Sequence, residues 1–141
     1  MIAEKRKLFF SSLSVVLDLQ AVTGLHMARV FHRDVKPDNM LIINNDLVLH
    51  DFDVSCLADS TAATLQMRAG TDAFWSPLWK PGMQYRAIDD LASLLLSFAS
   101  LLSMHTEPPI ECIRWVVQLP NAPQSMVETA DRVLRIFEEE S

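Results

Sequence analysis

Residues 32–51 of this 141-residue chain include an ammonium, a carboxamide and a pair of carboxylates in an order that could serve phosphoryl transfer. The segment HRDVKPDN carries Asp34, Lys36 and Asn39, and Asp51 follows at short range. An aspartate can orient and deprotonate a hydroxyl group, and a lysine two residues on can neutralise a transferring phosphoryl group. An asparagine and a second aspartate can hold the magnesium ion that bridges nucleotide phosphates. These residue types, in this order, predict phosphoryl transfer.

The first two motifs resemble those of eukaryotic-type protein kinases. HRDVKPDN matches the catalytic-loop pattern HRDxKPxN at each fixed position. The tripeptide DFD at residues 51–53 resembles the magnesium-binding DFG motif, with Asp53 in place of glycine.

Two further motifs follow in the order expected of the C-terminal lobe of these kinases. Residues 70–78, GTDAFWSPL, resemble GTxx[FY]xAPE, with Ser76 in place of alanine and Leu78 in place of glutamate. Residues 89–94, DDLASL, resemble the start of the buried helix that comes next. The resemblance covers roughly residues 5–105, and four ordered motifs are a far more specific signal than a lone HxD.

The resemblance implies a role for each chemically active residue. Asp34 is expected to be the catalytic base, and Lys36 is expected to reach the γ-phosphate and stabilise developing charge. Asn39 and Asp51 are expected to bind magnesium, which prefers hard oxygen ligands. Lysine followed by proline resembles the Ser/Thr-directed kinases more than the tyrosine-directed ones. The implied nucleotide-binding residues are Lys36, Asp38, Asn39, Leu41 and Asp51.

The resemblance also implies residues that hold the loops in place. His32 and Phe52 resemble members of the apolar stack that links the two lobes, and Asp90 resembles the helix aspartate that accepts hydrogen bonds from the catalytic-loop backbone. Asp89 or Asp90 is the predicted N-terminal cap of that helix. Arg33 often pairs with a phosphorylated residue in the family, for which Ser60, Thr61 and Thr64 are candidates here. The implied structural set is His32, Arg33, Phe52, Thr71 and Asp90.

The sequence predicts a mainly α-helical fold with one small β-hairpin, corresponding to a kinase C-terminal lobe alone. Apolar residues at helical spacing indicate a helix over 5–28. Two short apolar runs around Asn44-Asn45-Asp46 indicate a hairpin. A segment that is apolar almost all round indicates a buried helix. The expected order is helix 5–28, catalytic loop 31–40, hairpin 41–50, activation segment 51–78, buried helix 87–104 and two divergent helices within 109–139.

Departures from the family pattern centre on three features. The sequence has three glycines, so a GxGxxG phosphate loop cannot be formed, and we expect the N-terminal lobe to be missing from this stretch. Asp53 replaces a glycine whose backbone freedom the DFG loop uses, although aspartate tolerates left-handed torsions better than most residues. Leu78 cannot make the ion pair of the family glutamate, and packed apolar groups can replace such a pair.

The bulk composition limits the function classes. Half of the residues are hydrophobic, which is typical of a folded chain. A net charge of −6 argues against a nucleic-acid partner. Cys56 and Cys112 have no metal-ligand spacing and form no disulfide framework, which favours a reducing, cytoplasmic or nuclear location.

A signal peptide is the alternative for the N-terminus, because a basic head at residues 5–7 precedes the apolar run 8–17. Serines interrupt that run and no clear cleavage site follows, so we expect a helix instead. The apolar segment 91–102 is too short to span a bilayer, so no membrane association is expected.

Three functions compete at this stage. The first is a Ser/Thr protein kinase lobe that uses ATP and Mg²⁺ on a protein substrate, with a partner or upstream segment supplying the nucleotide clamp. The second is a pseudokinase or truncated kinase that serves as an interaction scaffold. The third is a small-molecule phosphotransferase of the aminoglycoside or choline kinase type, against which Lys36-Pro37 and the motif at 70–78 both argue.

Overall fold

The structure, a computed structural model, describes residues 12–44, 46–65, 67–102, 104, 108–120 and 122–141. Most of the segment 5–17, for which a signal peptide was the alternative, therefore lies outside the described residues. So does the first part of the helix expected over 5–28. From Ser12 onward that helix is present. No helix in the described ranges is both long and apolar enough to cross a membrane.

The described elements are mostly helical, as the sequence predicted. The helices are α2 (Ser12–Met27), α3 (Ala87–Leu101), α4 (Pro109–Val116) and α5 (Gln124–Glu139). Strands β1 (Val30–Phe31) and β4 (Cys56–Leu57) form one antiparallel pair, and β2 (Met40–Ile43) and β3 (Asp46–Leu49) form a hairpin in which Met40 lies opposite Leu49. Short 3₁₀ turns cover Pro37–Asn39, Thr61–Ala63 and Asp72–Phe74.

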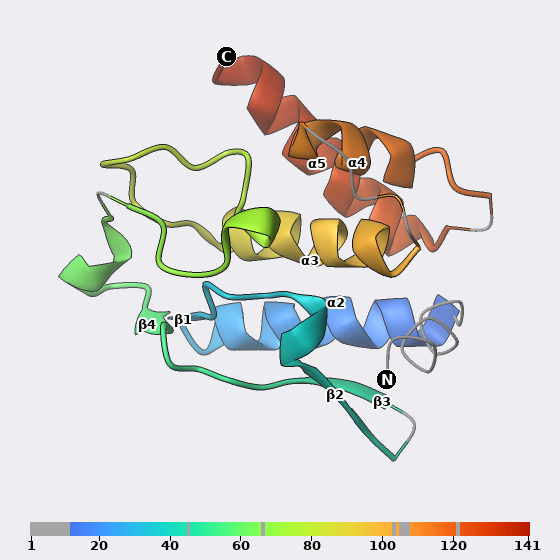
Figure 1. Ribbon diagram of the computed structural model, residues 1–141, viewed down its shortest axis with the longest axis horizontal. Coiled ribbons are helices and arrows are strands. Elements are labelled where there is room, and N and C mark those ends of the chain that lie inside the picture. Colours follow the sequence, from blue (N-terminus) through green and yellow to red (C-terminus); the bar gives the residue numbers. More distant parts are fainter. Residues whose placement is uncertain (1–11, 45, 66, 103, 105–107, 121) are drawn as a thin grey trace.

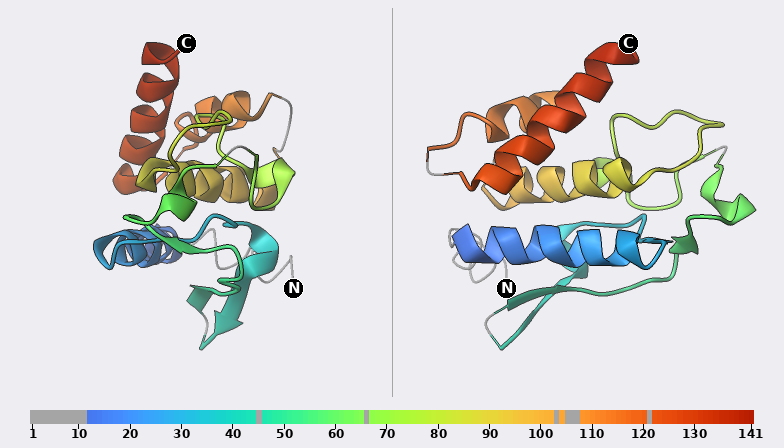
Figure 2. Two further views of the ribbon diagram at one scale, coloured as in Figure 1. Left: turned by 90° about the vertical axis from the view of Figure 1, so that its left-hand side faces the viewer. Right: turned by 180° about the vertical axis from the view of Figure 1, so that it is seen from behind.

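Helix α3 lies at the centre of the lobe. It runs beside α2, and α4 and α5 cover its other side, while the β2–β3 hairpin lies on the far side of α2 (Figure 1). The view from behind shows α5 crossing obliquely over α3 (Figure 2). The long loop between β4 and α3 extends from one end of the molecule.

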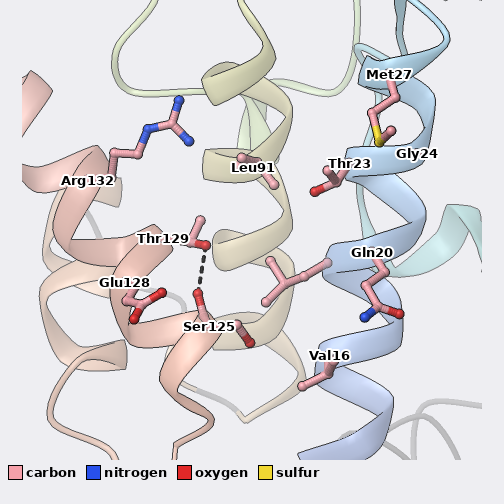
Figure 3. A pocket seen from close by; sticks show the side chains of 11 residues that line it. Val16, Gln20, Thr23, Gly24, Met27, Leu91, Ser125, Glu128, Thr129 and Arg132 are labelled. Atoms are coloured by element: carbon pink, nitrogen blue, oxygen red, sulfur yellow. Dashed lines mark hydrogen bonds between the residues drawn. The ribbon is translucent and has the colours of Figure 1, made fainter.

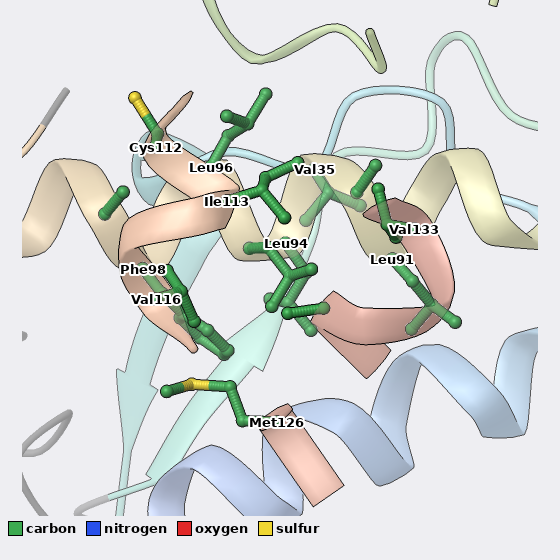
Figure 4. Close-up of a cluster of buried hydrophobic side chains, with 14 of the residues drawn as sticks. Val35, Leu91, Leu94, Leu96, Phe98, Cys112, Ile113, Val116, Met126 and Val133 are labelled. Atoms are coloured by element: carbon green, nitrogen blue, oxygen red, sulfur yellow. The ribbon is translucent and has the colours of Figure 1, made fainter. Parts of the chain in front are cut away.

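Burial of α3 on every side explains its sequence. Of its fifteen residues, all but Ala87 and Ser100 are buried. Its Leu94 and Phe98 pack with Ile113 of α4 and Met126 of α5 in the main core (Figure 4). The helix therefore cannot be displaced without opening that core.

Helix α2 contributes one stripe to the same core. Val15, Leu19 and Val22 are buried, and their spacing of four and three residues puts them on one face. A second, smaller cluster joins β1 to the end of the 51–78 segment. It contains Phe31, Ala63, Trp75, Trp79 and Tyr85.

The start of α3 differs from the prediction. The N-cap is Arg86, in extended backbone geometry, and Asp89 is the third helical residue. The predicted cap at Asp89 or Asp90 is therefore wrong, because the helix begins at Ala87, and Asp89 Oδ2 instead accepts from the Arg86 N–H as the third residue of a capping box. The helix also ends at Leu101, earlier than the predicted 104.

Candidate active site

The carboxylate of Asp34 is fixed by three hydrogen bonds. Its Oδ1 accepts from the backbone N–H of Thr71 at 3.0 Å and from the Thr71 hydroxyl at 2.9 Å. Its Oδ2 accepts from Asn39 Nδ2 at 3.0 Å. The side chain keeps 16% of its surface exposed, so the group is both oriented and reachable from solvent.

Lys36 joins the same cluster through Thr71. Its Nζ donates to Thr71 Oγ1 at 2.7 Å and lies 4.0 Å from Asp34 Oδ2. The Thr71 hydroxyl therefore accepts from the ammonium and donates to the carboxylate. A threonine from the distant 70–78 motif thus links the two residues predicted to act on the phosphoryl group.

Asn39 closes the catalytic loop. It ends the 3₁₀ turn Pro37–Asn39 and is buried, and its Nδ2 donates to the backbone oxygen of Asp34 at 2.8 Å as well as to the Asp34 carboxylate. Its own carbonyl oxygen accepts from the backbone N–H of His50 at 2.8 Å. These bonds use the amide N–H groups and hold the side chain in one orientation.

The fully buried Asp90 holds the loop backbone from beneath. Its Oδ2 accepts from the His32 N–H and its Oδ1 from the Arg33 N–H, both at 2.9 Å. The Tyr85 hydroxyl donates to Oδ1 at 2.6 Å, and His26 Nε2 lies 2.9 Å from Oδ2. Arg33 has a φ of 69°, an uncommon torsion for this residue type, and these bonds offset its strain.

His26 and Tyr85 are functional neighbours that sequence reasoning missed. His26 lies 64 residues from Asp90, so no local pattern indicates the contact. Burial, and then the nearby Asp90 charge, raise the pKa of Tyr85 well above its usual value. Its phenol therefore stays protonated and remains a donor to the carboxylate.

His32 and Phe52 lie against each other, as the resemblance implied. Their ring centroids are 4.9 Å apart with a tilt of 60°. The His32 Nδ1 accepts from the backbone N–H of Asp34 at 3.1 Å, which makes Nε2 the donor to the His50 carbonyl oxygen at 2.9 Å. Phe52 is 47% exposed, so one side of this pair has no cover among the described residues.

Asp51 is exposed and has a φ of 62°, so the left-handed residue of the DFD loop is Asp51. Asp53, which stands in place of the family glycine, has no positive φ, so its tolerance of left-handed torsions is not used. Its N–H instead donates to Asp51 Oδ1 at 3.3 Å. No hydrogen bond joins Asp51 to Asp34, Lys36 or Asn39, all of which the structure describes.

The remaining predicted residues lie around this cluster. Leu41, on β2, and Asp38, in the 3₁₀ turn, are both exposed. The Arg33 guanidinium donates to the backbone oxygens of Val54 and Ala62, at 2.7 Å each, and so holds the segment that contains Ser60, Thr61 and Thr64.

A cavity of about 570 Å³ lies away from these residues, between α2 and α5 (Figure 3). Its walls include Gln20 and Thr23 of α2, Glu128 and Arg132 of α5, and Leu91 of α3. A smaller cavity of about 220 Å³ lies beside Pro77 and Phe137. The Asp34 cluster lines neither of them.

Known proteins show clear similarity to this chain in both sequence and fold. A family model described as protein kinase domain matches residues 12–111. A probable serine/threonine-protein kinase of Dictyostelium discoideum is 34% identical over 101 residues, which is 67% of this chain and 15% of that protein. A dual specificity mitogen-activated protein kinase kinase of Caenorhabditis elegans is 33% identical over 105 residues, which is 73% of this chain and 26% of that protein.

The fold also matches a solved structure, that of the CAK complex from Chaetomium thermophilum bound to ATP-γ-S. The TM-score is 0.56 at 20% identity, covering 85% of this chain and 40% of the matched chain. The chain belongs to the protein kinase family. It spans about a quarter or less of the length of the two relatives named above.

Proposed function

We propose that this chain is the catalytic lobe of a serine/threonine protein kinase, which transfers the γ-phosphate of ATP to a protein hydroxyl. The observation that carries the proposal is the Asp34–Thr71–Lys36 cluster, in which a fixed carboxylate and an ammonium lie 4.0 Å apart on a solvent-accessible surface. A general base must be positioned before its pKa matters, and three hydrogen bonds position this one.

Asp34 Oδ2 is the atom expected to accept the substrate proton. Oδ1 already accepts two hydrogen bonds from Thr71, whereas Oδ2 accepts one from Asn39. A carboxylate oxygen has about two lone-pair sites, so Oδ2 keeps one for an incoming hydroxyl. Lys36 lies on the same side and is expected to stabilise charge on the transferring group.

Asn39 and Asp51 fit a magnesium ion by the chemistry of their donors. Both offer hard oxygen ligands, and the Asn39 N–H bonds to Asp34 leave its amide oxygen as the atom for the metal. When bound, Mg²⁺ neutralises charge on the nucleotide phosphates. Asp51 is exposed and can approach without first breaking an ion pair among the described residues.

The hairpin side of the lobe supports a partner that supplies or replaces the N-terminal lobe. Leu41, Ile43 and Val48 of the hairpin and nearby Phe52 are 36–49% exposed. The β2–β3 pair forms a two-stranded sheet of its own, so its outer face has no protein cover among the described residues. Contiguous exposed apolar patches usually mark an interaction surface. The same face also favours the second candidate function, an interaction scaffold derived from a kinase.

Calorimetric titration with ATP, with and without Mg²⁺, tests the proposal when an Asp51→Ala variant is run beside the parent chain. Magnesium-dependent binding that the variant loses supports a competent lower half of the nucleotide site. An absence of binding in both proteins would favour the scaffold. Transfer to generic protein substrates, and not to aminoalcohols or aminoglycosides, separates the protein kinase from a small-molecule phosphotransferase.

The cellular compartment stays part of this proposal. Cys56 and Cys112 are both free thiols, which supports an intracellular location because reducing compartments keep thiols unpaired.

A further inference from the structure

Two consecutive carboxylates are buried in the first turn of α3. Asp89 and Asp90 both have an exposed fraction of 0%. Buried carboxylates are costly unless hydrogen-bonded, and the N-terminal turn of a helix is the position where its dipole favours negative charge. Asp90 is used by the catalytic loop, as described above. Asp89 serves a different loop.

The partner of Asp89 is Ser76, at the end of the activation segment. The Ser76 hydroxyl donates to Asp89 Oδ1 at 2.6 Å, and the Ser76 hydroxyl oxygen in turn accepts from the backbone N–H of Leu78 at 3.2 Å. Asp89 Oδ2 accepts from the backbone N–H of Arg86 at 2.8 Å. Ser76 is only 2% exposed, so these bonds are shielded from water.

Burial raises the pKa of the Asp89 carboxyl above its usual value, and the Ser76 hydrogen bond is the largest opposing influence. The Ser76 hydroxyl therefore favours the charged form of Asp89, together with the backbone N–H and the charge of Arg86. The Arg86 guanidinium also approaches Asp89 Oδ2, at 3.7 Å, and pairs with Glu140 at the end of α5 at 2.8 Å. That outer pair is partly exposed and adds less than the buried bond.

The segment between Thr71 and Ser76 is short and structured. The 3₁₀ turn Asp72–Phe74 fills it, with Phe74 N–H donating to the Thr71 carbonyl at 3.1 Å and Trp75 N–H to the Asp72 carbonyl at 3.2 Å. Because this turn is tight, the position of Ser76 limits that of Thr71.

We propose that Asp89 and Ser76 are positioning residues, which fix the end of the activation segment on α3 and thereby hold Thr71 against Asp34. Two neighbouring residues of one helical turn then position the two loops of the site. Asp90 positions the catalytic loop, and Asp89 positions the activation segment. Leu78 stands where the resembled family pattern has its anchoring glutamate, and it packs into the main core. The Ser76–Asp89 hydrogen bond supplies the polar anchor. The assignment rests on the proposed function, because Thr71 matters through Asp34.

Hydrogen exchange read by mass spectrometry tests the anchor without requiring activity. The variants are Ser76→Ala, Asp89→Asn and their combination. Ser97→Ala is the matched control, because its buried hydroxyl on the same helix donates to the Ser93 carbonyl at 2.9 Å, reaches the Val35 carbonyl of the catalytic loop only at 3.5 Å, and has no hydrogen bond to the described residues of the activation segment. Exchange over residues 70–75 is expected to rise about ten- to a hundredfold in Ser76→Ala and Asp89→Asn, with α3 unchanged. The control should leave residues 70–75 as they are.

The increase in exchange rate in the combined variant should be smaller than the product of the increases in the two single variants, because each single variant removes the same hydrogen bond. Uniformly faster exchange that includes α3, or no change over 70–75, would overturn the anchor. In transfer assays, the single variants should lower kcat about tenfold or more with Mg·ATP binding unchanged, which a merely structural role would not produce. If the exchange results hold but the parent chain neither binds nor transfers, the proposed function fails and the anchor stands.

Discussion

Replacing Gly70 by alanine puts one methyl group at the closest approach of the activation segment to the catalytic loop. A Cβ at this position would lie 2.2 Å from the Arg33 carbonyl oxygen and 3.0 Å from Asp34 Oδ1. The Arg33 oxygen is backbone and has little freedom to retreat, because the Arg33 N–H is bonded to the buried Asp90. The activation segment must therefore move instead.

The size of that movement follows from the contact. Relieving a 2.2 Å approach to an ordinary close contact needs a shift of roughly 1 Å. Thr71 is the next residue, and its bonds to Asp34 at 2.9 and 3.0 Å would stretch toward 4 Å, beyond hydrogen-bonding range. Overpacking of this kind costs about 1–3 kcal/mol, and a lost hydrogen bond to a charged group costs about 1.5–3 kcal/mol. The shift that breaks the hydrogen bonds also relieves part of the overpacking, so the two costs do not add in full, and we expect a loss of about 2–4 kcal/mol in the free energy of unfolding.

Urea unfolding followed by tryptophan fluorescence and circular dichroism measures this loss. Gly24→Ala is the matched control, because an added Cβ there meets nothing within 4 Å and the residue lies in helix α2. That variant should be stabilised by about 0.5–1 kcal/mol, since alanine favours a helix over glycine. If Gly70→Ala changes stability by less than about 0.5 kcal/mol, the close approach does not constrain the loop and the reasoning is refuted.

Three further predictions address other parts of the lobe. The pKa of Tyr85 is raised in the folded chain, so its contribution to stability is complete below the unfolded-state pKa near 10 and falls by up to about 1.4 kcal/mol per pH unit above it. Because Tyr85 is the only tyrosine in the sequence, tyrosinate absorbance should rise only as helical dichroism falls. Ionisation near pH 10 in a chain that is still folded would contradict the burial of Tyr85. Asp34→Asn should reduce phosphoryl transfer at least about 100-fold with calorimetric ATP binding retained, and undiminished turnover would remove Asp34 from the mechanism. Replacing Ile43 and Val48 by threonine should reduce binding of an apolar dye without loss of dichroism, and unchanged dye binding would mean that the hairpin face is not the exposed patch.

The parts of the site that sequence could predict are the local ones. The catalytic loop and the hairpin are encoded within about twenty residues, and each carries its own signal, a motif in one case and two apolar runs around turn formers in the other. The buried helix was predicted from its apolar surface on all sides, and the structure buries nearly all of it. Asp90 was assigned to the loop backbone through the family resemblance, and its bonds to His32 and Arg33 have that geometry.

The parts that sequence could not predict depend on contacts between distant residues. His26 meets Asp90 across 64 positions, and Ser76 meets Asp89 only because the activation segment folds back onto α3. Asp89 was predicted as the N-cap because aspartate at a helix start usually is one, yet the helix begins at Ala87, and Asp89 divides its two oxygens between the Arg86 N–H and the Ser76 hydroxyl. The left-handed torsion falls on Asp51, since either aspartate of DFD tolerates it and only the packed loop decides.

The two faces of the site differ in how far this lobe determines them. On the substrate-facing side, Asp34, Lys36 and Thr71 are joined by hydrogen bonds that lead back to buried carboxylates on α3, so residues of this lobe set their geometry. On the nucleotide-facing side, Asp51 and Phe52 are exposed. The catalytic loop keeps its strained torsion at Arg33, with a φ of 69°, because hydrogen bonds within the lobe hold it. An exposed loop lacks such bonds and is ordered only when another part of the protein or a ligand covers it. Nucleotide binding should therefore be the property most sensitive to the loss or replacement of an N-terminal lobe. The orientation of the catalytic base Asp34 should be the least sensitive.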